Sequence, residues 1–280
     1  MRKVNVSKIR EAVKNLSIQT NLEAAPDLIK ALKKYQKQET SSIGGILFKE
    51  MLENINIARY KKIPICQDTG ITVVFLEIGQ EVLLVGGEVE TAINEGVKQG
   101  YKEGYLRKSV VKDPLNRKNT GDNTPAVIHY RIVPGEKVKI TVAPKGFGSE
   151  NMSKITMLKP TEGIVAIKKF VLDTVKAGGS NFCPPIVIGI GIGGSFEKAA
   201  LLSKEALLRP LGRYNKKKHL ADLEKEIFKD VNSLGVGAQG LGGKITTIGV
   251  HILDYATHIA GLPVAVNTCC HVYRHGSVTI

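Results

Sequence analysis

The stretch Ile186-Val187-Ile188-Gly189-Ile190-Gly191-Ile192-Gly193-Gly194 decides the fold class of this 280-residue chain. Its β-branched apolar residues form a short continuous run, which predicts a buried strand. The glycines at its end predict a tight turn, and residues 196–208 after it have the pattern of a helix. A strand that leads through a glycine-rich turn into a helix indicates an α/β protein.

The same glycines resemble a dinucleotide-binding fingerprint, because Gly189, Gly191 and Gly194 have the required spacing. That fingerprint also needs a second strand that ends in an acidic residue about 20 positions later. Here Arg209-Pro210-Leu211-Gly212 and a basic loop occupy this place, and a helix over 221–231 precedes the next strand. A nucleotide site is therefore disfavoured, and we expect the glycines to shape a turn near Cys183.

Outward from this stretch, apolar residues recur at helical spacing through residues 1–60, which predicts a mainly helical start. Strands predicted at 71–78 and 81–85 are separated by Gly79-Gln80, and strands predicted at 127–133 and 137–142 flank Pro134-Gly135. Each pair predicts an antiparallel hairpin. We therefore predict a mixed α/β (α+β) fold with one globular domain over residues 1–280, a mixed sheet, antiparallel hairpins and an N-terminal helical region.

Composition narrows the class of protein. Lys and Arg total 40 against 26 Asp and Glu, a net charge of +14, yet Lys216-Lys217-Lys218 is the one tight basic cluster. Trp is absent and aromatic residues are few, so no base-stacking platform is evident and a nucleic-acid partner is disfavoured. No apolar run approaches the roughly 20 residues of a membrane span. Because the chain shows no secretory leader, we expect a cytoplasmic location without disulfides.

The four cysteines lie in stretches of polar and turn-forming residues. Cys66 lies in Pro64-Ile65-Cys66-Gln67-Asp68-Thr69-Gly70, Cys183 precedes Pro184-Pro185, and Cys269 and Cys270 are adjacent. Three thiolates can hold an iron–sulfur cluster and leave one iron without a protein ligand. The alternative is a set of unrelated buried thiols, because cysteine is among the most buried residue types.

Several motifs together resemble the iron–sulfur-dependent class I fumarate hydratase and tartrate dehydratase family, specifically the α subunit of its two-subunit form. The resemblance runs from about residue 40 onward and rests on the following stretches in the family's order: Cys66 to Gly70, Asn119-Thr120-Gly121-Asp122-Asn123-Thr124-Pro125-Ala126, Cys183-Pro184-Pro185, Gly235-Val236-Gly237-Ala238-Gln239, and Pro263 to Cys270.

The resemblance implies a role for particular residues. It implies that Cys66, Cys183 and Cys270 hold a 4Fe–4S cluster, with Cys269 as a bystander. It implies that Gln67, Asp68, Arg107 and Gly146 contact substrate, and that Asp68 and His258 are catalytic. The remaining histidines are expected to be structural or solvated.

The family resemblance implies a reversible hydration or dehydration of a C4 dicarboxylate, with fumarate plus water to malate first and tartrate dehydration as the alternative. This chemistry needs a Lewis acid at the hydroxyl oxygen and a base at carbon. The resemblance implies that a β subunit supplies the base and completes an α2β2 assembly. Two other classes stay open: a basic nucleic-acid-binding protein with a structural metal, and an iron–sulfur electron carrier.

Overall fold

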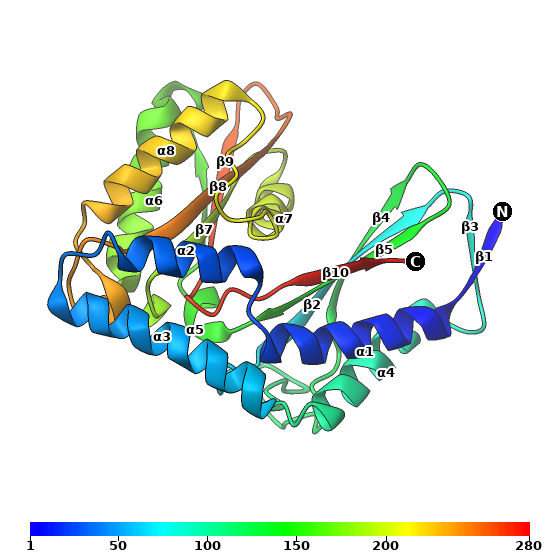
Figure 1. Ribbon diagram of the computed structural model, residues 1–280. Helices are drawn as coiled ribbons and strands as arrows, with labels where there is room; N and C mark the ends of the chain where they lie inside the picture. The colour runs from blue at the N-terminus through cyan, green and yellow to red at the C-terminus, as the bar shows by residue number, and fades with distance from the viewer. The chain divides into compact units, whose positions relative to one another are not determined.

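A computed structural model describes all residues, 1–280, and shows two compact units (Figure 1). Unit 1 comprises Met1–Ala25, Asn54–Phe147 and Arg274–Ile280, and unit 2 comprises Pro26–Glu53 and Gly148–Tyr273. Each unit has its own sheet and its own apolar core. The fold class is mixed α/β with mixed sheets, as the sequence predicted.

Unit 1 is built on a four-stranded sheet with the order β10-β5-β2-β4 and a two-stranded parallel pair, β1 and β3. β2 pairs parallel to β4 and antiparallel to β5, and β10 pairs antiparallel to β5. Helices α1 and α4 pack against each other beside this sheet (Figure 1). The bounds are β1 (Arg2–Asn5), α1 (Val6–Leu22), β2 (Ile71–Gly79), β3 (Val82–Val85), α4 (Val89–Glu103), β4 (Val127–Val133), β5 (Val138–Lys145) and β10 (Gly276–Thr279).

The helix α1 shows how the local sequence forms this core. The side chain of Asn5 caps the helix by accepting a hydrogen bond from the Ser7 N–H at 2.9 Å, which satisfies one of the unpaired donors of the first turn. Ile9, Val13 and Leu16 recur at helical spacing and are buried against the sheet. The apolar periodicity of the sequence thus becomes one packed face.

The two predicted hairpins are not formed, which corrects the sequence-based expectation. β3 pairs with β1 instead of β2, and β2 lies between β4 and β5. The Pro134-Gly135 turn passes around the end of β2, where Gln80 N–H donates to the Val133 carbonyl and Gly79 N–H donates to the Lys137 carbonyl. Turn residues between two strands predict a reversal of the chain, but they do not specify which strand fills the space between them.

Unit 2 contains a four-stranded sheet with the order β6-β9-β7-β8, in which β7 pairs parallel to β8 and antiparallel to β9. Helices α6 and α8 contribute to the core on one face, and α7 packs against the sheet (Figure 1). The bounds are β6 (Lys154–Leu158), η1 (Pro160–Glu162), α6 (Gly163–Gly178), η2 (Gly179–Phe182), β7 (Ile186–Gly193), α7 (Phe196–Ala206), α8 (Lys218–Asn232), η3 (Ala238–Gly240), β8 (Thr247–Tyr255) and β9 (Leu262–Cys269).

The glycines of β7 let α7 approach the strand closely. A Cβ at Gly189 would lie 2.1 Å from the Ser203 carbonyl oxygen, and one at Gly191 would lie 2.1 Å from the Ala199 carbonyl oxygen. The turn that precedes α7 uses Gly193 instead, where φ is +90°. The expectation that these glycines shape a turn near Cys183 is therefore wrong, because Cys183 lies at the other end of β7.

The N-terminal helical region is confirmed by α1, α2 (Pro26–Gln36) and α3 (Ser42–Lys61), with the short strand β1 in front of them. The boundary between the units falls within α3 and within the single-turn helix α5 (Phe147–Glu150). The sequence missed β1, β6 and β10, which are strands of at most five residues at sheet edges or in the small pair. No helix combines the length and the apolar character that crossing a membrane requires.

Candidate active site

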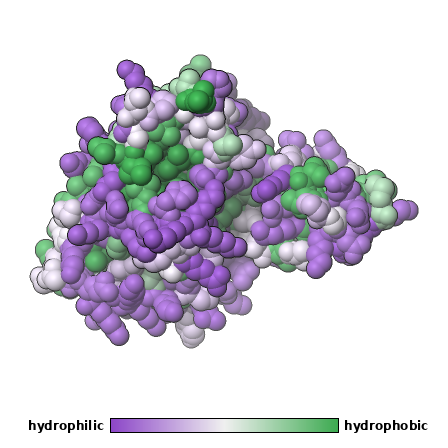
Figure 2. Space-filling view, turned by 90° about the horizontal axis from the view of Figure 1, so that it is seen from above, coloured by the Kyte–Doolittle hydropathy of each residue, from purple (hydrophilic) through white to green (hydrophobic).

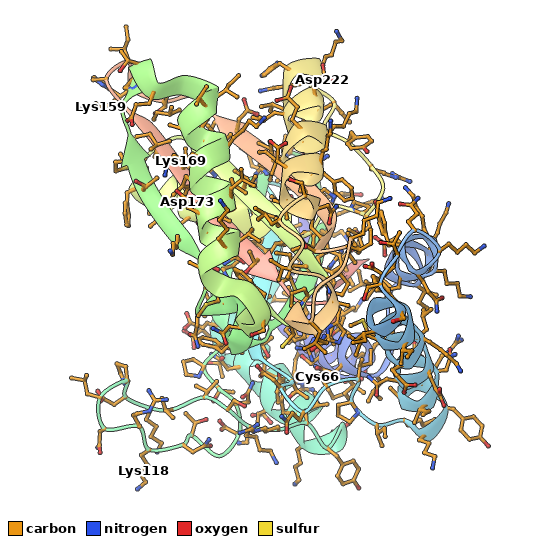
Figure 3. All side chains as sticks on the ribbon, turned by 90° about the vertical axis from the view of Figure 1, so that its left-hand side faces the viewer. Cys66, Lys118, Lys159, Lys169, Asp173 and Asp222 are labelled. Atoms are coloured by element: carbon orange, nitrogen blue, oxygen red, sulfur yellow. The ribbon has the colours of Figure 1, made fainter.

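Residues 62–70 connect α3 to β2, and the loop of residues 66–70 within them begins with Cys66 (Figure 3). Gln67 and Asp68 follow Cys66 in this loop. Cys66 is half-buried, and its Sγ accepts the Asp68 N–H at 3.4 Å. Gly70 closes the loop with φ of +78°, and a Cβ there would lie 2.7 Å from the backbone of Lys145. Only glycine therefore allows this loop to lie against the end of β5.

Two buried side chains, Tyr101 and Asn123, hold the loop of residues 66–70 by hydrogen bonds to its backbone. The Tyr101 hydroxyl donates to the Thr69 carbonyl at 2.7 Å and to the Gly70 carbonyl at 3.0 Å. The Gly70 carbonyl also accepts from Asn123 Nδ2 at 3.2 Å. Tyr101 is fully buried, and this burial raises the pKa of its phenol above the ordinary value. The hydroxyl therefore stays protonated and remains a donor at neutral pH.

The Asp68 carboxylate is oriented by backbone N–H groups. Its Oδ1 accepts from Gly70 N–H at 3.0 Å, and its Oδ2 accepts from Phe147 N–H at 2.8 Å. A Cβ at Gly146 would lie 3.1 Å from Oδ2 of Asp68. The structure thus brings together Asp68 and Gly146, two of the residues that the sequence assigned to substrate binding.

Arg107 joins the same neighbourhood through its backbone. Its carbonyl accepts the Thr69 hydroxyl at 2.9 Å, while its side chain is exposed to solvent. Asn119 Nδ2 donates to the Lys108 carbonyl at 3.0 Å, so this asparagine helps to order the loop. A guanidinium on a fixed backbone beside the 66–70 loop is available to an anionic ligand.

The buried Arg274 was not anticipated from the sequence. Its Nη1 donates to Asn21 Oδ1 on α1 at 2.8 Å, and its Nη2 donates to the Asp68 carbonyl at 2.8 Å. Burying a guanidinium is costly unless its donors have acceptors. Nη1 and Nη2 have them, whereas the buried Nε has none. Arg274 is 6% exposed, and it fastens the backbone of Asp68 to a helix of the core. No sequence motif marked it, because its partners are remote in the chain.

Unit 2 brings Cys183 and the segment after Cys270 together. Cys183 is exposed and follows η2 with a left-handed φ of +51°, and Cys270 is half-buried directly after β9. The Cys183 carbonyl lies 3.4 Å from the His271 backbone nitrogen and 3.0 Å from His271 Nδ1. Cys269 points into the interior and is 7% exposed, whereas Cys66 belongs to unit 1.

The donor chemistry of these cysteines fits an iron–sulfur cluster. Thiolates are the ligands that such clusters take, and Cys66, Cys183 and Cys270 each retain some exposure to solvent. The structure contains no group of three or more His, Cys, Asp or Glu side chains arranged to hold a metal ion. The side chains present therefore match a cluster in kind, without forming a closed metal site.

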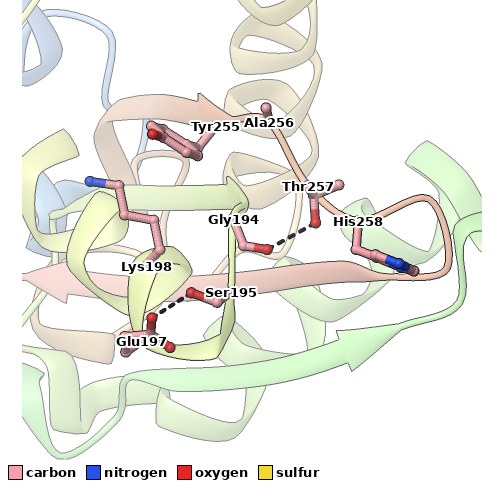
Figure 4. Close-up of a pocket in the computed structure, with 8 residues that line it drawn as sticks. All are labelled: Gly194, Ser195, Glu197, Lys198, Tyr255, Ala256, Thr257 and His258. Carbon is pink, nitrogen blue, oxygen red and sulfur yellow. Dashed lines mark hydrogen bonds between the residues drawn. The ribbon is translucent and has the colours of Figure 1, made fainter.

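His258 lines a pocket of about 590 Å³ in unit 2 (Figure 4). The pocket lies between the turn before α7 and the loop after β8, and the Thr257 hydroxyl ties the two by donating to the Gly194 carbonyl at 2.9 Å. His258 is exposed, and its Nδ1 accepts from Ala260 N–H at 3.2 Å. In neutral imidazole this bond places the ring proton on Nε2. The remaining lining residues are Ser195, Glu197, Lys198, Tyr255 and Ala256.

A family model described as fumarate hydratase (Fumerase) matches residues 10–279 of this chain. The chain belongs to the fumarate hydratase (Fumerase) family. A Methanocaldococcus jannaschii protein provisionally named L(+)-tartrate dehydratase subunit alpha is 42% identical over 277 residues, which cover 95% of each chain. The L(+)-tartrate dehydratase subunit alpha of Escherichia coli strain K12 and that of Shigella sonnei are each 34% identical over 278 residues, which cover 98% of this chain and 91% of each relative.

Membership of the fumarate hydratase family agrees with the resemblance found in the motifs. The names of the family and of these relatives denote enzymes that add or remove water, so the chain is of hydro-lyase type. Within this family member, the loop at 66–70 and the turn at Cys183 are two of the places where the sequence motifs become ordered local structure.

Proposed function

We propose that this chain is the α subunit of a hydro-lyase that interconverts a C4 2-hydroxy dicarboxylate and its dehydrated product. The observation that carries the proposal is the ordered neighbourhood of the Cys66 loop, in which Asp68 lies beside Gly146 and the backbone of Arg107 accepts from Thr69. Fumarate is the substrate that the family's name suggests, and L(+)-tartrate is the one that the relatives' names suggest. Malate, the hydrated form of fumarate, and tartrate differ by one hydroxyl group, so both reactions belong in the assay.

We assign Cys66, Cys183 and Cys270 as ligands of a 4Fe–4S cluster. Such a cluster supplies a Lewis acid for the substrate hydroxyl oxygen when it is bound. Three separate segments carry these cysteine sulfurs. Cys66 Sγ accepts the Asp68 N–H, and the Cys183 carbonyl accepts the N–H of His271, the residue after Cys270. The buried Cys269 remains outside this set.

The other residues bind substrate and handle protons. The planar guanidinium of Arg107 can donate two parallel hydrogen bonds to one carboxylate. The exposed amide of Gln67 and the backbone at Gly146 offer further polar contacts. Asp68 presents a carboxylate held by two N–H donors, and His258 presents Nε2; we assign these two as the catalytic acid–base groups.

A β subunit is expected to complete the enzyme in an α2β2 assembly. Support comes from the subunit names of the relatives and from apolar side chains left in solvent, such as Ile259, which follows His258 and is 91% exposed. Hydrophobic patches also interrupt a mainly hydrophilic face of the molecule (Figure 2). Contiguous patches of this kind, rather than a single exposed side chain, mark surfaces that other chains cover.

The basic charge supports this function better than nucleic-acid binding. The lysines labelled in Figure 3, Lys118, Lys159 and Lys169, come from separate segments. Lys217, in the one basic cluster, pairs with Asp254 at 2.6 Å, and Lys169 pairs with Asp173 on α6. These pairs neutralise part of the basic charge, whereas a nucleic-acid site needs basic side chains that cluster on one face.

The test uses anaerobically purified full-length chain, alone and with a coexpressed β subunit, assayed with fumarate, malate and L(+)-tartrate. We expect cluster absorbance and iron in the parent and in Cys269→Ser, and loss of both in Cys66→Ser, Cys183→Ser and Cys270→Ser. Turnover should require the β subunit. Normal iron content in Cys270→Ser, or full turnover by the α chain alone, contradicts the corresponding part of the proposal.

A further inference from the structure

The glycine-rich segment around Gln239 packs directly against the turn of Cys183 in unit 2. The Gln239 backbone N–H donates to the Pro184 carbonyl at 2.8 Å, and its side-chain Nε2 donates to the same carbonyl at 3.0 Å. A Cβ at Gly240 would lie 2.5 Å from Cβ of Ser180 in η2. One residue thus makes two hydrogen bonds to the carbonyl next to Cys183.

The same amide nitrogen of Gln239 also reaches the residue that follows Cys270. Nε2 lies 3.2 Å from His271 Nδ1, which itself lies 3.0 Å from the Cys183 carbonyl. The Pro184 carbonyl has no hydrogen, so the amide atom that faces it is the nitrogen, and the second N–H of this nitrogen is free to face the ring. Gln239 is therefore in contact with the backbone after Cys183 and with the side chain after Cys270.

Both tautomers of His271 preserve a link between the two cysteine segments. When Nδ1 carries no proton, it accepts from Gln239, and the His271 backbone N–H serves the Cys183 carbonyl at 3.4 Å. When Nδ1 carries the proton, it donates to the Cys183 carbonyl directly. The ring makes one of these bonds at a time. The first links His271 to Gln239, which itself donates to the Pro184 carbonyl, and the second links His271 to the Cys183 carbonyl.

The backbone conformation supports a role beyond packing. Cys183 has φ of +51° and Gln239 has φ of +53°, and both are in the left-handed region that residues with a side chain rarely adopt. Such conformations persist where surrounding contacts over-determine them, and they concentrate at functional sites. Here the over-determining contacts are the bonds between Gln239, Pro184 and His271.

We propose that Gln239, together with His271, is a positioning residue that sets the separation and orientation of the Cys183 and Cys270 thiols. That these thiols are cluster ligands rests on the proposed function; that Gln239 sets their separation does not. Partners that orient the ligands of a metal site, without binding the metal, commonly change metal affinity or activity about 10–100-fold when mutated. An amide that holds both cysteine segments is placed to act in this way.

The first experiment measures the thiol pair without any cluster. In apo protein that carries Cys66→Ser and Cys269→Ser, dibromobimane fluoresces only after both of its arms have alkylated thiols, so it reports bridging of Cys183 and Cys270. We expect rapid bridging in this parent and about tenfold slower bridging in Gln239→Ala, by analogy with the effect of removing such orienting partners. The matched control is Gln80→Ala, on an exposed turn of unit 1, which should bridge at the parent rate.

A second variant separates positioning from misfolding. Gln239→Glu keeps the size and the backbone donor but removes the amide N–H groups, so we expect it to melt near the parent temperature and still bridge slowly. Absence of bridging in the parent, or equal rates in the parent and both Gln239 variants, overturns the proposal.

The second experiment uses the full-length chain with all cysteines after anaerobic cluster reconstitution. We expect Gln239→Glu to bind iron more weakly and to give an altered electron paramagnetic resonance spectrum after oxidation. If the parent binds no cluster but Gln239→Ala still slows bridging, the proposed cofactor fails and the positioning role stands. If cluster, spectrum and bridging are all unchanged in the variants, the positioning role fails and the proposed function stands.

Discussion

Replacing Tyr101 with Phe removes one hydroxyl and leaves the ring, so it tests whether this buried tyrosine holds the loop of Cys66 and Asp68. The hydroxyl donates to the Thr69 and Gly70 carbonyls from a position with no exposure to solvent. Gly70 keeps a second donor in Asn123 Nδ2, so Thr69 is the carbonyl that loses most. Leaving a buried acceptor without its donor costs about 1–3 kcal/mol.

Urea unfolding of purified protein measures this cost. We expect Tyr101→Phe to lower the free energy of unfolding by about 1–3 kcal/mol, and Tyr60→Phe, whose side chain is 87% exposed, to change it by less than about 0.5 kcal/mol. With the β subunit present, Tyr101→Phe should also lower kcat/KM, because Gln67 and Asp68 lose part of their support. Equal unfolding free energies for the two variants would refute the reasoning.

The raised pKa of Tyr101 makes the stability of the parent protein depend on pH, and Tyr101→Phe removes this dependence. Burial raises this pKa above its ordinary value of 10.0, so above about pH 10 the unfolded chain loses a proton that the folded chain retains. The contribution of this group to the free energy of unfolding is complete below pH 10 and declines as the pH rises further. Tyr101→Phe should therefore show a shallower alkaline loss of stability than the parent.

Other variants test the remaining contacts. Arg107→Lys should weaken substrate binding by about 1.5–3 kcal/mol, since an ammonium cannot form the paired hydrogen bonds of the guanidinium, and unchanged kinetic constants would make Arg107 a surface residue. Arg274→Lys should lose one of the bonds to Asn21 and Asp68 and melt at a lower temperature, so an unchanged melting temperature would contradict their importance. Burial raises the pKa of Glu39, but bonds from four backbone N–H groups outweigh burial and leave it below 4.5. This carboxylate therefore contributes to the free energy of unfolding above pH 4.5, and the contribution is lost as the pH falls further. Glu39→Gln should therefore lose less stability than the parent below pH 4.5. Equal losses of stability in acid for the two proteins would contradict this role of Glu39.

Local patterns in the sequence were sufficient for the helices and for the residues of the site loops. Helix α7 and helix α8 were predicted because apolar periodicity and turn residues act within a few positions of each other. The neighbourhood of Cys66 was predicted because the motif Cys66 to Gly70 is contiguous in the chain. Gly146 and Arg107 required the family resemblance, and the structure places both beside this loop.

Strand partners and the supports of the site were decided only by the tertiary structure. The strand β2 separates β4 from β5, although turn residues predicted that these two would pair, because sheet order depends on which apolar faces can be buried together. Arg274 meets Asp68 across 206 positions and Tyr101 meets Thr69 across 32, and neither distance leaves a pattern in a single sequence. The sequence by itself identified the groups that can do the chemistry, whereas folding determined which buried side chains hold them, because hydrogen bonds between remote segments form only once the core is packed.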